Sequence, residues 1–239
     1  MRKAGAVLAE LFLAIQPKIV PGVTTHELDK FAEEFIQKKG AIPAFKGYHG
    51  FPATLCTSVN DEVVHGIPGK KVIHEGDIIG VDVGCIVNGF YADAARTYAI
   101  GVVTQQELDL IETTRDALKC GIEQVKVGNQ ISDISHAIQK RIQKKGYGIV
   151  RQYVGHGIGK SLHEEPQIPN FGHPKQGAVI QVGMAFAIEP MVNMGKEEVV
   201  VAEDGWTVVT KDGKKSAHFE NTIIVTEKGR EIITEITNA

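Results

Sequence analysis

Residues 77–97, DIIGVDVGCIVNGFYADAART, contain the turn and the two acids that decide the fold. Asn-Gly at 88–89 lies between two apolar runs, the strongest short-range signal for a β-hairpin with a two-residue turn. In that register Gly84 lies opposite Asp93, and Asp82 shares the face of Gly84 because side chains alternate along a strand. Asp82 and Asp93 are then diagonal neighbours, with backbones roughly 7–8 Å apart.

The two faces of this hairpin differ in a way that indicates a ligand site. Gly80 and Gly84 share the face of Asp82, and glycines beside an acid on a strand leave room for a ligand. The opposite face is apolar, so the hairpin is expected to be half buried. A buried carboxylate costs free energy unless its charge is compensated. We therefore expect Asp82 and Asp93 to face a bound cation.

An internal repeat predicts a second, similar half. The pentapeptide IQKKG occurs at 36–40 and recurs at 142–146, an offset of 106 residues (142 against 36). Each copy ends a stretch with helical spacing of apolar residues, and lysines followed by glycine are typical of a helix end. Tyr-His-Gly at 48–50 aligns with Gly-His-Gly at 155–157 at nearly the same offset.

The second half contributes two more acids on predicted strands. Residues 182–190 form an apolar run that ends in an acid, Glu189, and residues 216–225 form another strand with Glu220 inside it. If the repeat holds, Glu220 corresponds to Asp93. A pseudo-twofold axis would then bring the acids of both halves together.

The predicted fold class is α+β. The halves span roughly residues 1–100 and 101–239, and no polar linker separates them, so we expect a single catalytic domain of residues 1–239. Their strands are expected to join one antiparallel sheet, with helices on its outer face.

Four converging carboxylates need positive charge around them. They are Asp82, Asp93, Glu189 and Glu220. Two divalent cations balance four negative charges, and metal ions roughly 3.5–4 Å apart, bridged by carboxylates, are a recurring hydrolytic arrangement. The sequence therefore predicts a site for two divalent metal ions. Carboxylates with one imidazole accept Mn, Fe(II), Co or Zn.

Three histidines are candidates for the same site. His156 lies in GHGIG at 155–159, His163 follows it by seven residues, and His65 lies in VVHGIP. A histidine taken alone is more often structural than a ligand. Glycines on both sides of His156 expose the imidazole on a loop or strand edge, where it can reach a metal.

Bulk composition argues against several function classes. The 239 residues carry 26 basic and 29 acidic side chains, a net charge of −3, which is unlike the basic face of a nucleic-acid-binding protein. No apolar run approaches the roughly 20 residues of a membrane-spanning helix. Three cysteines and no CxxC pair argue against a disulfide framework or a thiolate zinc site, so we expect a reducing, cytoplasmic location.

These motifs, in this order, resemble those of the type I methionine aminopeptidases. The resemblance runs from about residue 2 to 226. Its motifs are NDEVVHGIP at 60–68, Asp82 followed eleven residues later by Asp93 and AART, GHGIG with His163, IEPM at 188–191 and FENT at 219–222.

The resemblance implies the pita-bread fold and a role for each ligand. Asp82 is expected to chelate one metal and His156 and Glu189 the other, while Asp93 and Glu220 bridge both. Catalytic roles are implied for His65 and His163, which would contact the scissile peptide, and for Glu189, which would carry a proton to the leaving amine. The implied substrate-binding residues are His65, His163, Tyr48, Phe51, Cys56 and Trp206.

The implied activity is removal of the initiator methionine from nascent proteins, preferably when the second residue is small. The implied partners are peptide N-termini and the ribosome, and a monomer is expected. A monovalent cation near Asn60 and Ser216 is also implied by the resemblance.

Three other protein classes match this sequence less well. Prolidases and aminopeptidase P share the metal ligands but usually carry an added N-terminal domain, which we do not expect here. Non-catalytic binding proteins of the same fold have typically lost ligands, whereas this sequence has all five. A mononuclear iron oxygenase needs two histidines and one carboxylate, which does not match one histidine with four acids.

Overall fold

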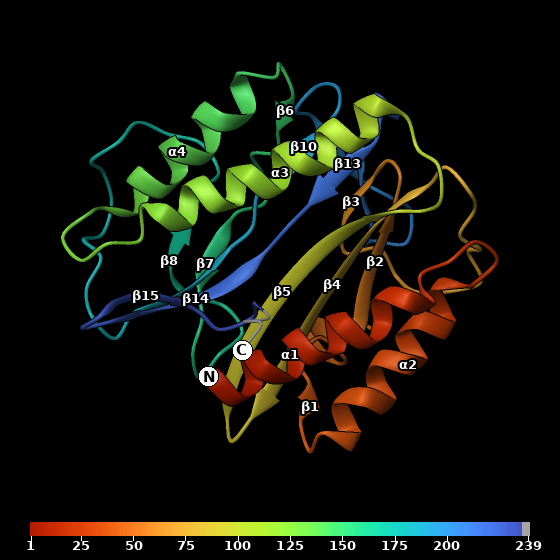
Figure 1. The fold of residues 1–239 in the computed structure, drawn as a ribbon, viewed down its shortest axis with the longest axis horizontal. Coiled ribbons are helices and arrows are strands. Elements are labelled where there is room, and N and C mark those ends of the chain that lie inside the picture. Colours follow the sequence, from red (N-terminus) through yellow and green to blue (C-terminus); the bar gives the residue numbers. More distant parts are fainter. Residues whose placement is uncertain (236–239) are drawn as a thin grey trace.

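The computed structural model describes residues 1–235, in which helices pack along the outside of antiparallel strands (Figure 1). The helices are α1 (Arg2–Ile15), η1 (Gln16–Lys18), α2 (Thr25–Lys38), η2 (Tyr48–Gly50), α3 (Gln105–Glu123) and α4 (Ile131–Gln143). The strands before residue 100 are β1 (Ile42–Pro43), β2 (Leu55–Val59), β3 (Glu62–Val64), β4 (Ile78–Val87) and β5 (Phe90–Ala99). The later strands are β6 (Gly148–Ile149), β7 (Gly155–Gly157), β8 (Glu164–Ile168), β9 (Ala185–Ile188), β10 (Met191–Asn193), β11 (Val199–Val201), β12 (Val208–Thr210), β13 (Ser216–His218), β14 (Asn221–Thr226) and β15 (Gly229–Ile232).

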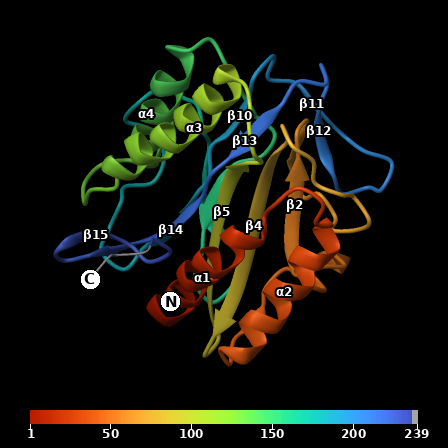
Figure 2. The ribbon, with the colours of Figure 1, turned by 45° about the vertical axis from the view of Figure 1, so that its right-hand side comes forward.

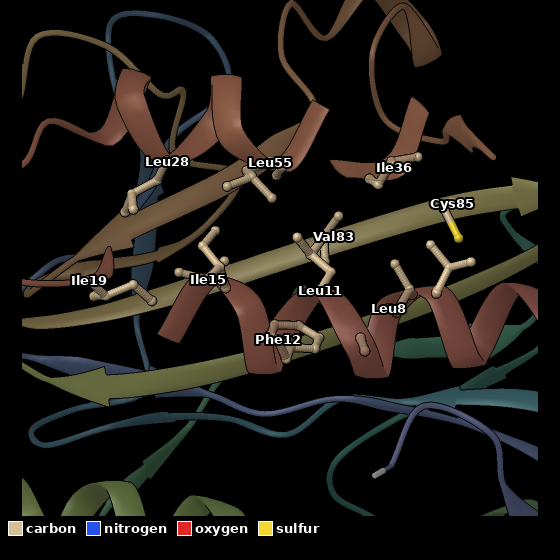
Figure 3. Packing of buried hydrophobic residues seen from close by; sticks show 14 of the residues in the cluster. Leu8, Leu11, Phe12, Ile15, Ile19, Leu28, Ile36, Leu55, Val83 and Cys85 are labelled. Atoms are coloured by element: carbon tan, nitrogen blue, oxygen red, sulfur yellow. The ribbon is translucent and has the colours of Figure 1, made fainter. Parts of the chain in front are cut away.

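Helix α1 covers the outer face of the β4–β5 hairpin. Leu8, Leu11 and Ile15 recur at three- and four-residue spacing, which places them on one side of the helix. They are buried in one cluster with Val83 and Cys85 of β4 (Figure 3). Burial of each large apolar side chain contributes about 1.5–3 kcal/mol, so this layer holds the hairpin firmly from behind.

Capping boxes begin α2 and α3. The Glu27 N–H donates to Thr24 Oγ1 at 3.2 Å, and the Thr24 N–H donates to the Glu27 carboxylate at 2.8 Å. Thr104 and Glu107 repeat this exchange at the start of α3. Such caps satisfy N–H groups that have no partner in the first helical turn. Helix α2 ends before Gly40, whose φ of 70° supports the predicted helix end.

The hairpin has the predicted register, with Gly84 paired to Asp93. Asn88 and Gly89 have φ values of 51° and 76°, as a two-residue primed turn requires. The interpretation of Gly84 was wrong, because its missing side chain makes room for protein rather than for a ligand. A Cβ at Gly84 would lie 2.8 Å from the ring of Phe45.

Two segments that align in the sequence repeat differ in conformation. Residues 48–50 form the 3-10 turn η2, whereas residues 155–157 form strand β7. Gly47, His49 and Gly50 all have positive φ, which bends the chain, while β7 is kept extended by pairing with β8 and β9. The alignment of these two segments therefore does not extend to their backbone.

The predicted strand 216–225 is divided in the structure. β13 ends at His218 and pairs with β10, and β14 begins at Asn221 and pairs with β9. Glu220 lies between them because its backbone pairs with Ala95 of β5: each N–H donates to the other's carbonyl, at 2.9 Å and 3.3 Å. This pairing joins the strands of the two halves, and Figure 2 shows β5 running beside β13 and β14.

The hydrogen-bonded strand orders are β1-β4-β2 with β5 on β4, β13-β10-β6, β11-β12-β3 and β15-β14-β9-β7-β8. The α+β class, the antiparallel pairing and the helices on the outer face are confirmed. The single sheet expected from both halves is instead divided, within residues 1–235, into four hydrogen-bonded sheets, because β5 meets the strands of the second half at the isolated Ala95–Glu220 bridge. None of the helices between residues 1 and 235 is long and apolar enough to cross a bilayer.

Candidate metal centre and substrate cavity

One cavity of about 240 Å³ brings together residues from both halves of the chain. Its walls include the five predicted ligands, both catalytic histidine candidates and the predicted pocket residues, namely Asp82, Asp93, His156, Glu189, Glu220, His65, His163, Tyr48, Phe51, Cys56 and Trp206. Phe45, His49 and Leu162 also line it and were not among the predicted site residues. The signal that points to Phe45 and His49 is their place beside Tyr48 in an aromatic, glycine-flanked segment.

Each acidic ligand candidate lies on a strand or next to one. Asp82 and Asp93 lie on the β4–β5 hairpin, Glu189 follows β9, and Glu220 lies between β13 and β14. One ligand atom from each of Asp93, His156 and Glu220 lies within 4.8 Å of the others. His156 Nε2 is also 3.5 Å from Glu189 Oε1, so the imidazole adjoins the acids of both halves.

The carboxylates lack the partners that buried charge requires. Among the described residues, Asp82 Oδ1, Asp93 Oδ1 and Glu220 Oε1 are buried and accept no hydrogen bond. Burial, followed by the charge of Asp93, raises the pKa of Asp82, Glu189 and Glu220 well above the ordinary carboxyl value. Orphaned, converging carboxylate oxygens fit divalent cations, which supply both the missing charge and the missing contacts.

His156 presents one nitrogen to this cluster. Its Nδ1 donates to the backbone carbonyl of Gly157 at 2.9 Å, since a carbonyl only accepts. The neutral ring therefore has its lone pair on Nε2, the atom beside Glu189. Burial lowers the pKa of His156 to about 4, so the ring stays neutral at physiological pH, as a metal ligand requires.

His65 and His163 form another part of the cavity wall. His65 follows β3 with a left-handed φ of 60°, and its ring packs edge-on against Tyr153 with centroids 5.5 Å apart. Burial lowers the pKa of His65 to about 4. The His163 ring packs edge-on against His156 at 4.3 Å, and its Nδ1 is 2.7 Å from Tyr48 Oη.

The rest of the cavity is apolar. Phe51 and Trp206 pack edge to face with centroids 5.2 Å apart. Cys56 is buried in the same cluster, and burial raises the pKa of its thiol well above the ordinary value, so it stays uncharged. Phe45 and Leu162 complete this cluster.

Asn60 and Ser216 are brought together outside the cavity. The Ser216 N–H donates to the Asn60 carbonyl at 2.8 Å, and Asn60 has a left-handed φ of 58°. The side chains bond within the protein: Asn60 Nδ2 donates to Asp77 Oδ1 at 2.8 Å, and Ser216 Oγ donates to Asn193 Oδ1 at 2.8 Å.

His218 is a neighbour of the site that the sequence analysis missed. Its ring is 4% exposed, and its Nε2 lies 3.8 Å from Glu189 Oε2 with no hydrogen-bond partner among residues 1–235. Its position two residues before Glu220 on a predicted strand was the available signal, because such residues share a face.

Residues 1–227 match the sequence model of metallopeptidase family M24. The chain is 51% identical to a methionine aminopeptidase of Clostridium acetobutylicum, covering 98% of this chain and 94% of that protein. It is 49% identical to methionine aminopeptidase 1 of Bacillus subtilis, covering 99% and 95%. The crystal structure of methionine aminopeptidase from Thermotoga maritima superposes with a TM-score of 0.97 at 48% identity, covering 99% and 95% of the two chains. The prolidase of Pyrococcus furiosus, at 23% identity and a TM-score of 0.81, shares the fold. This chain therefore belongs to metallopeptidase family M24 and, within it, to the methionine aminopeptidases.

Proposed function

We propose that this protein hydrolyses the peptide bond after an N-terminal methionine in newly made proteins, with preference for a small second residue. The supporting observation is that one cavity holds both a cluster of orphaned carboxylates and an apolar wall. The apolar wall of Phe51, Cys56 and Trp206 suits an uncharged thioether side chain. The names of its relatives favour the same substrate.

The proposed metal ligands are Asp82 for one divalent cation, His156 and Glu189 for a second, and Asp93 and Glu220 for both. Mn, Fe(II), Co and Zn suit this donor set of carboxylate oxygens and one imidazole nitrogen. When bound, such cations supply Lewis acidity and lower the pKa of water, so that a nucleophile is available near neutral pH.

The chain's own residues orient the substrate and move the proton. We assign His65 and His163 to the scissile peptide, because both line the cavity that also holds the carboxylates and the apolar wall. Glu189 is assigned to proton transfer, since its carboxylate faces His156 on one side and His218 on the other. A carboxylate in this position can accept a proton and deliver it to the leaving amine.

Three finer proposals accompany this function. A monovalent cation binds near the Asn60 carbonyl and Ser216, where the left-handed Asn60 turns its backbone. The protein acts as a monomer, and its location is the cytoplasm, where the three free cysteines stay reduced. Its substrate first appears at the ribosome, so contact with emerging chains is expected there.

The test is release of free methionine from Met-Ala-Ser by chelator-stripped protein, with and without added Mn or Co. Methionine released only with metal supports the proposal. An Xaa-Pro dipeptide is the matched control substrate. Hydrolysis of that dipeptide in place of Met-Ala-Ser would indicate a prolidase-like activity, and hydrolysis of neither by folded, metal-loaded protein would indicate a binding protein.

A further inference from the structure

One hydrogen bond joins two side chains of the cavity wall that come from different halves of the chain. Tyr48 Oη lies 2.7 Å from His163 Nδ1, although 115 residues separate them in sequence. Their rings pack at 5.3 Å between centroids. Both side chains line the cavity, Tyr48 half buried and His163 more exposed.

Tyr48 is held by hydrogen bonds of its backbone, and His163 follows a residue whose side chain is buried. The Tyr48 N–H donates to the Phe45 carbonyl at 2.9 Å, and the Phe51 N–H donates to the Tyr48 carbonyl at 3.0 Å. Beside His163, the side chain of Leu162 is 2% exposed and packs into the apolar cluster. The contact therefore joins the turn η2 to the segment that precedes β8.

The chemistry of the pair determines which atom carries the proton. A phenol O–H is a stronger acid than a neutral imidazole N–H, and an unprotonated imidazole nitrogen is the better acceptor. Burial raises the pKa of Tyr48, which keeps the hydroxyl protonated. Tyr48 therefore donates to Nδ1, and a neutral His163 carries its proton on Nε2.

The neighbouring histidine has the opposite tautomer. His156 donates from Nδ1 to the Gly157 carbonyl at 2.9 Å, which leaves a lone pair on its Nε2. The His156 and His163 rings are only 4.3 Å apart. The Nε2 atoms of the two adjacent rings therefore have different roles. His156 Nε2 has a lone pair that suits a metal, whereas His163 Nε2 has a proton that suits a substrate carbonyl oxygen.

We propose that Tyr48 is a positioning residue that fixes His163 as the Nε2–H tautomer, so that His163 donates a hydrogen bond to the substrate and does not bind metal. The contact to substrate rests on the proposed function. The tautomer itself does not, because it can be measured on the resting protein.

The test compares Tyr48→Phe with the wild type in the zinc-loaded, full-length protein. The substitution removes one hydroxyl and keeps the ring that faces the apolar cavity. ¹⁵N NMR of the imidazole nitrogens reports the tautomer of His163. The His163 signals are assigned by their disappearance from the spectrum of His163→Gln. Wild type is expected to show the proton on Nε2, and Tyr48→Phe a mixture of both tautomers. For Met-Ala-Ser we expect kcat to fall roughly threefold to tenfold with KM little changed.

Tyr153→Phe is the matched control. Tyr153 packs edge-on against His65, and its hydroxyl makes no hydrogen bond within the described chain. This variant is expected to keep the wild-type kcat and the wild-type His163 tautomer.

Two outcomes would overturn the role of Tyr48. One is that His163 of the wild-type protein carries its proton on Nδ1, and the wild-type spectrum alone can show this. The other is a Tyr48→Phe protein whose His163 tautomer is unchanged, whatever its kcat. Failure of the proposed function looks different, because the wild type would then release no methionine while its His163 still carried the proton on Nε2.

Discussion

The hydroxyl of Thr222 bonds both backbone groups of Asp93. Thr222 Oγ1 donates to the Asp93 carbonyl at 2.7 Å and accepts from the Asp93 N–H at 2.9 Å. A side chain of β14 thus satisfies the backbone of a candidate metal ligand on β5. The contact is buried and links residues 129 positions apart.

A second threonine hydroxyl, four residues further along β5, also bonds both backbone groups of one residue. Thr97 Oγ1 donates to the His218 carbonyl at 2.8 Å and accepts from its N–H at 2.9 Å. Between these two contacts lies the direct Ala95–Glu220 backbone pair. The Arg96 guanidinium also donates to the Glu220 carbonyl. Asp93 and Glu220, the two candidate bridging ligands, are therefore held relative to each other by a short seam with threonine hydroxyls on both sides.

We predict that Thr222→Val weakens divalent metal binding about tenfold. Substitution of a residue that hydrogen-bonds to a metal ligand typically lowers metal affinity by this order. Valine keeps the shape but leaves the Asp93 backbone groups buried without partners. Thr222→Ser should retain wild-type affinity. Calorimetric titration of chelator-stripped protein with Mn measures the Kd. Thr226→Val, at the far end of β14, is the control. Unchanged affinity in Thr222→Val would show that the seam does not position the ligands.

Asp93→Asn is expected to abolish methionine release while the protein remains folded. The amide lacks the charge and the second acceptor oxygen that a bridging carboxylate provides. The loss of turnover should therefore exceed the roughly 10–100-fold seen when a residue that only supports a metal ligand is replaced. Turnover of Met-Ala-Ser and circular dichroism give the two readouts. Asp116→Asn, on the exposed side of α3, should behave as wild type. Near-wild-type turnover by Asp93→Asn with metal present would contradict the two-metal site.

Asp29 should make folding stability depend on pH. Its Oδ1 accepts the N–H groups of Thr54 and Leu55 at 2.9 Å and 2.7 Å, and burial raises its pKa above the ordinary value. The stability contributed by the protonated form is present below the unfolded pKa of about 4 and is lost as pH rises through the raised folded pKa.

Asparagine keeps the acceptor oxygen but does not titrate. The free energy of unfolding of Asp29→Asn relative to wild type should therefore increase with pH across that window, as measured by urea denaturation. Asp29→Ala leaves two buried N–H groups unpaired and should lose about 2–4 kcal/mol at any pH. A constant difference between Asp29→Asn and wild type would refute the titration of Asp29.

Trp206→Ala should raise KM for Met-Ala-Ser roughly tenfold with a smaller effect on kcat. The substitution removes an aromatic ring from the apolar wall and leaves the carboxylates in place. The ring contacts Phe51 at 5.2 Å, and its backbone N–H is held by Asp204 Oδ1 at 2.8 Å. Trp206→Phe, which keeps an aromatic face, is the matched control. An unchanged KM in Trp206→Ala would place the methionine side chain elsewhere.

Local sequence signals were sufficient for the hairpin and for the four acids and the histidine candidates, whereas the pocket residues and the role of each ligand came from the family resemblance. Asn88-Gly89 specified the turn and hence the register that puts Asp93 opposite Gly84. The repeat located the helix ends, and the motif order located all five candidate ligands on the wall of one cavity. These features were readable because turn type, strand alternation and helix periodicity act between residues close in the chain.

Features that depend on two distant segments were not readable. The sequence did not indicate that Glu220 leaves its strand to pair with Ala95, or that Gly84 makes room for Phe45. Nor did it indicate the hydrogen bond between Tyr48 and His163, which are 115 residues apart. Hydrogen-bond partners of this kind are chosen by which backbone and side-chain groups are left unpaired when the halves meet. Local composition therefore placed the reactive groups, whereas packing between the halves decided contacts such as the Ala95–Glu220 pairing and the Tyr48–His163 hydrogen bond.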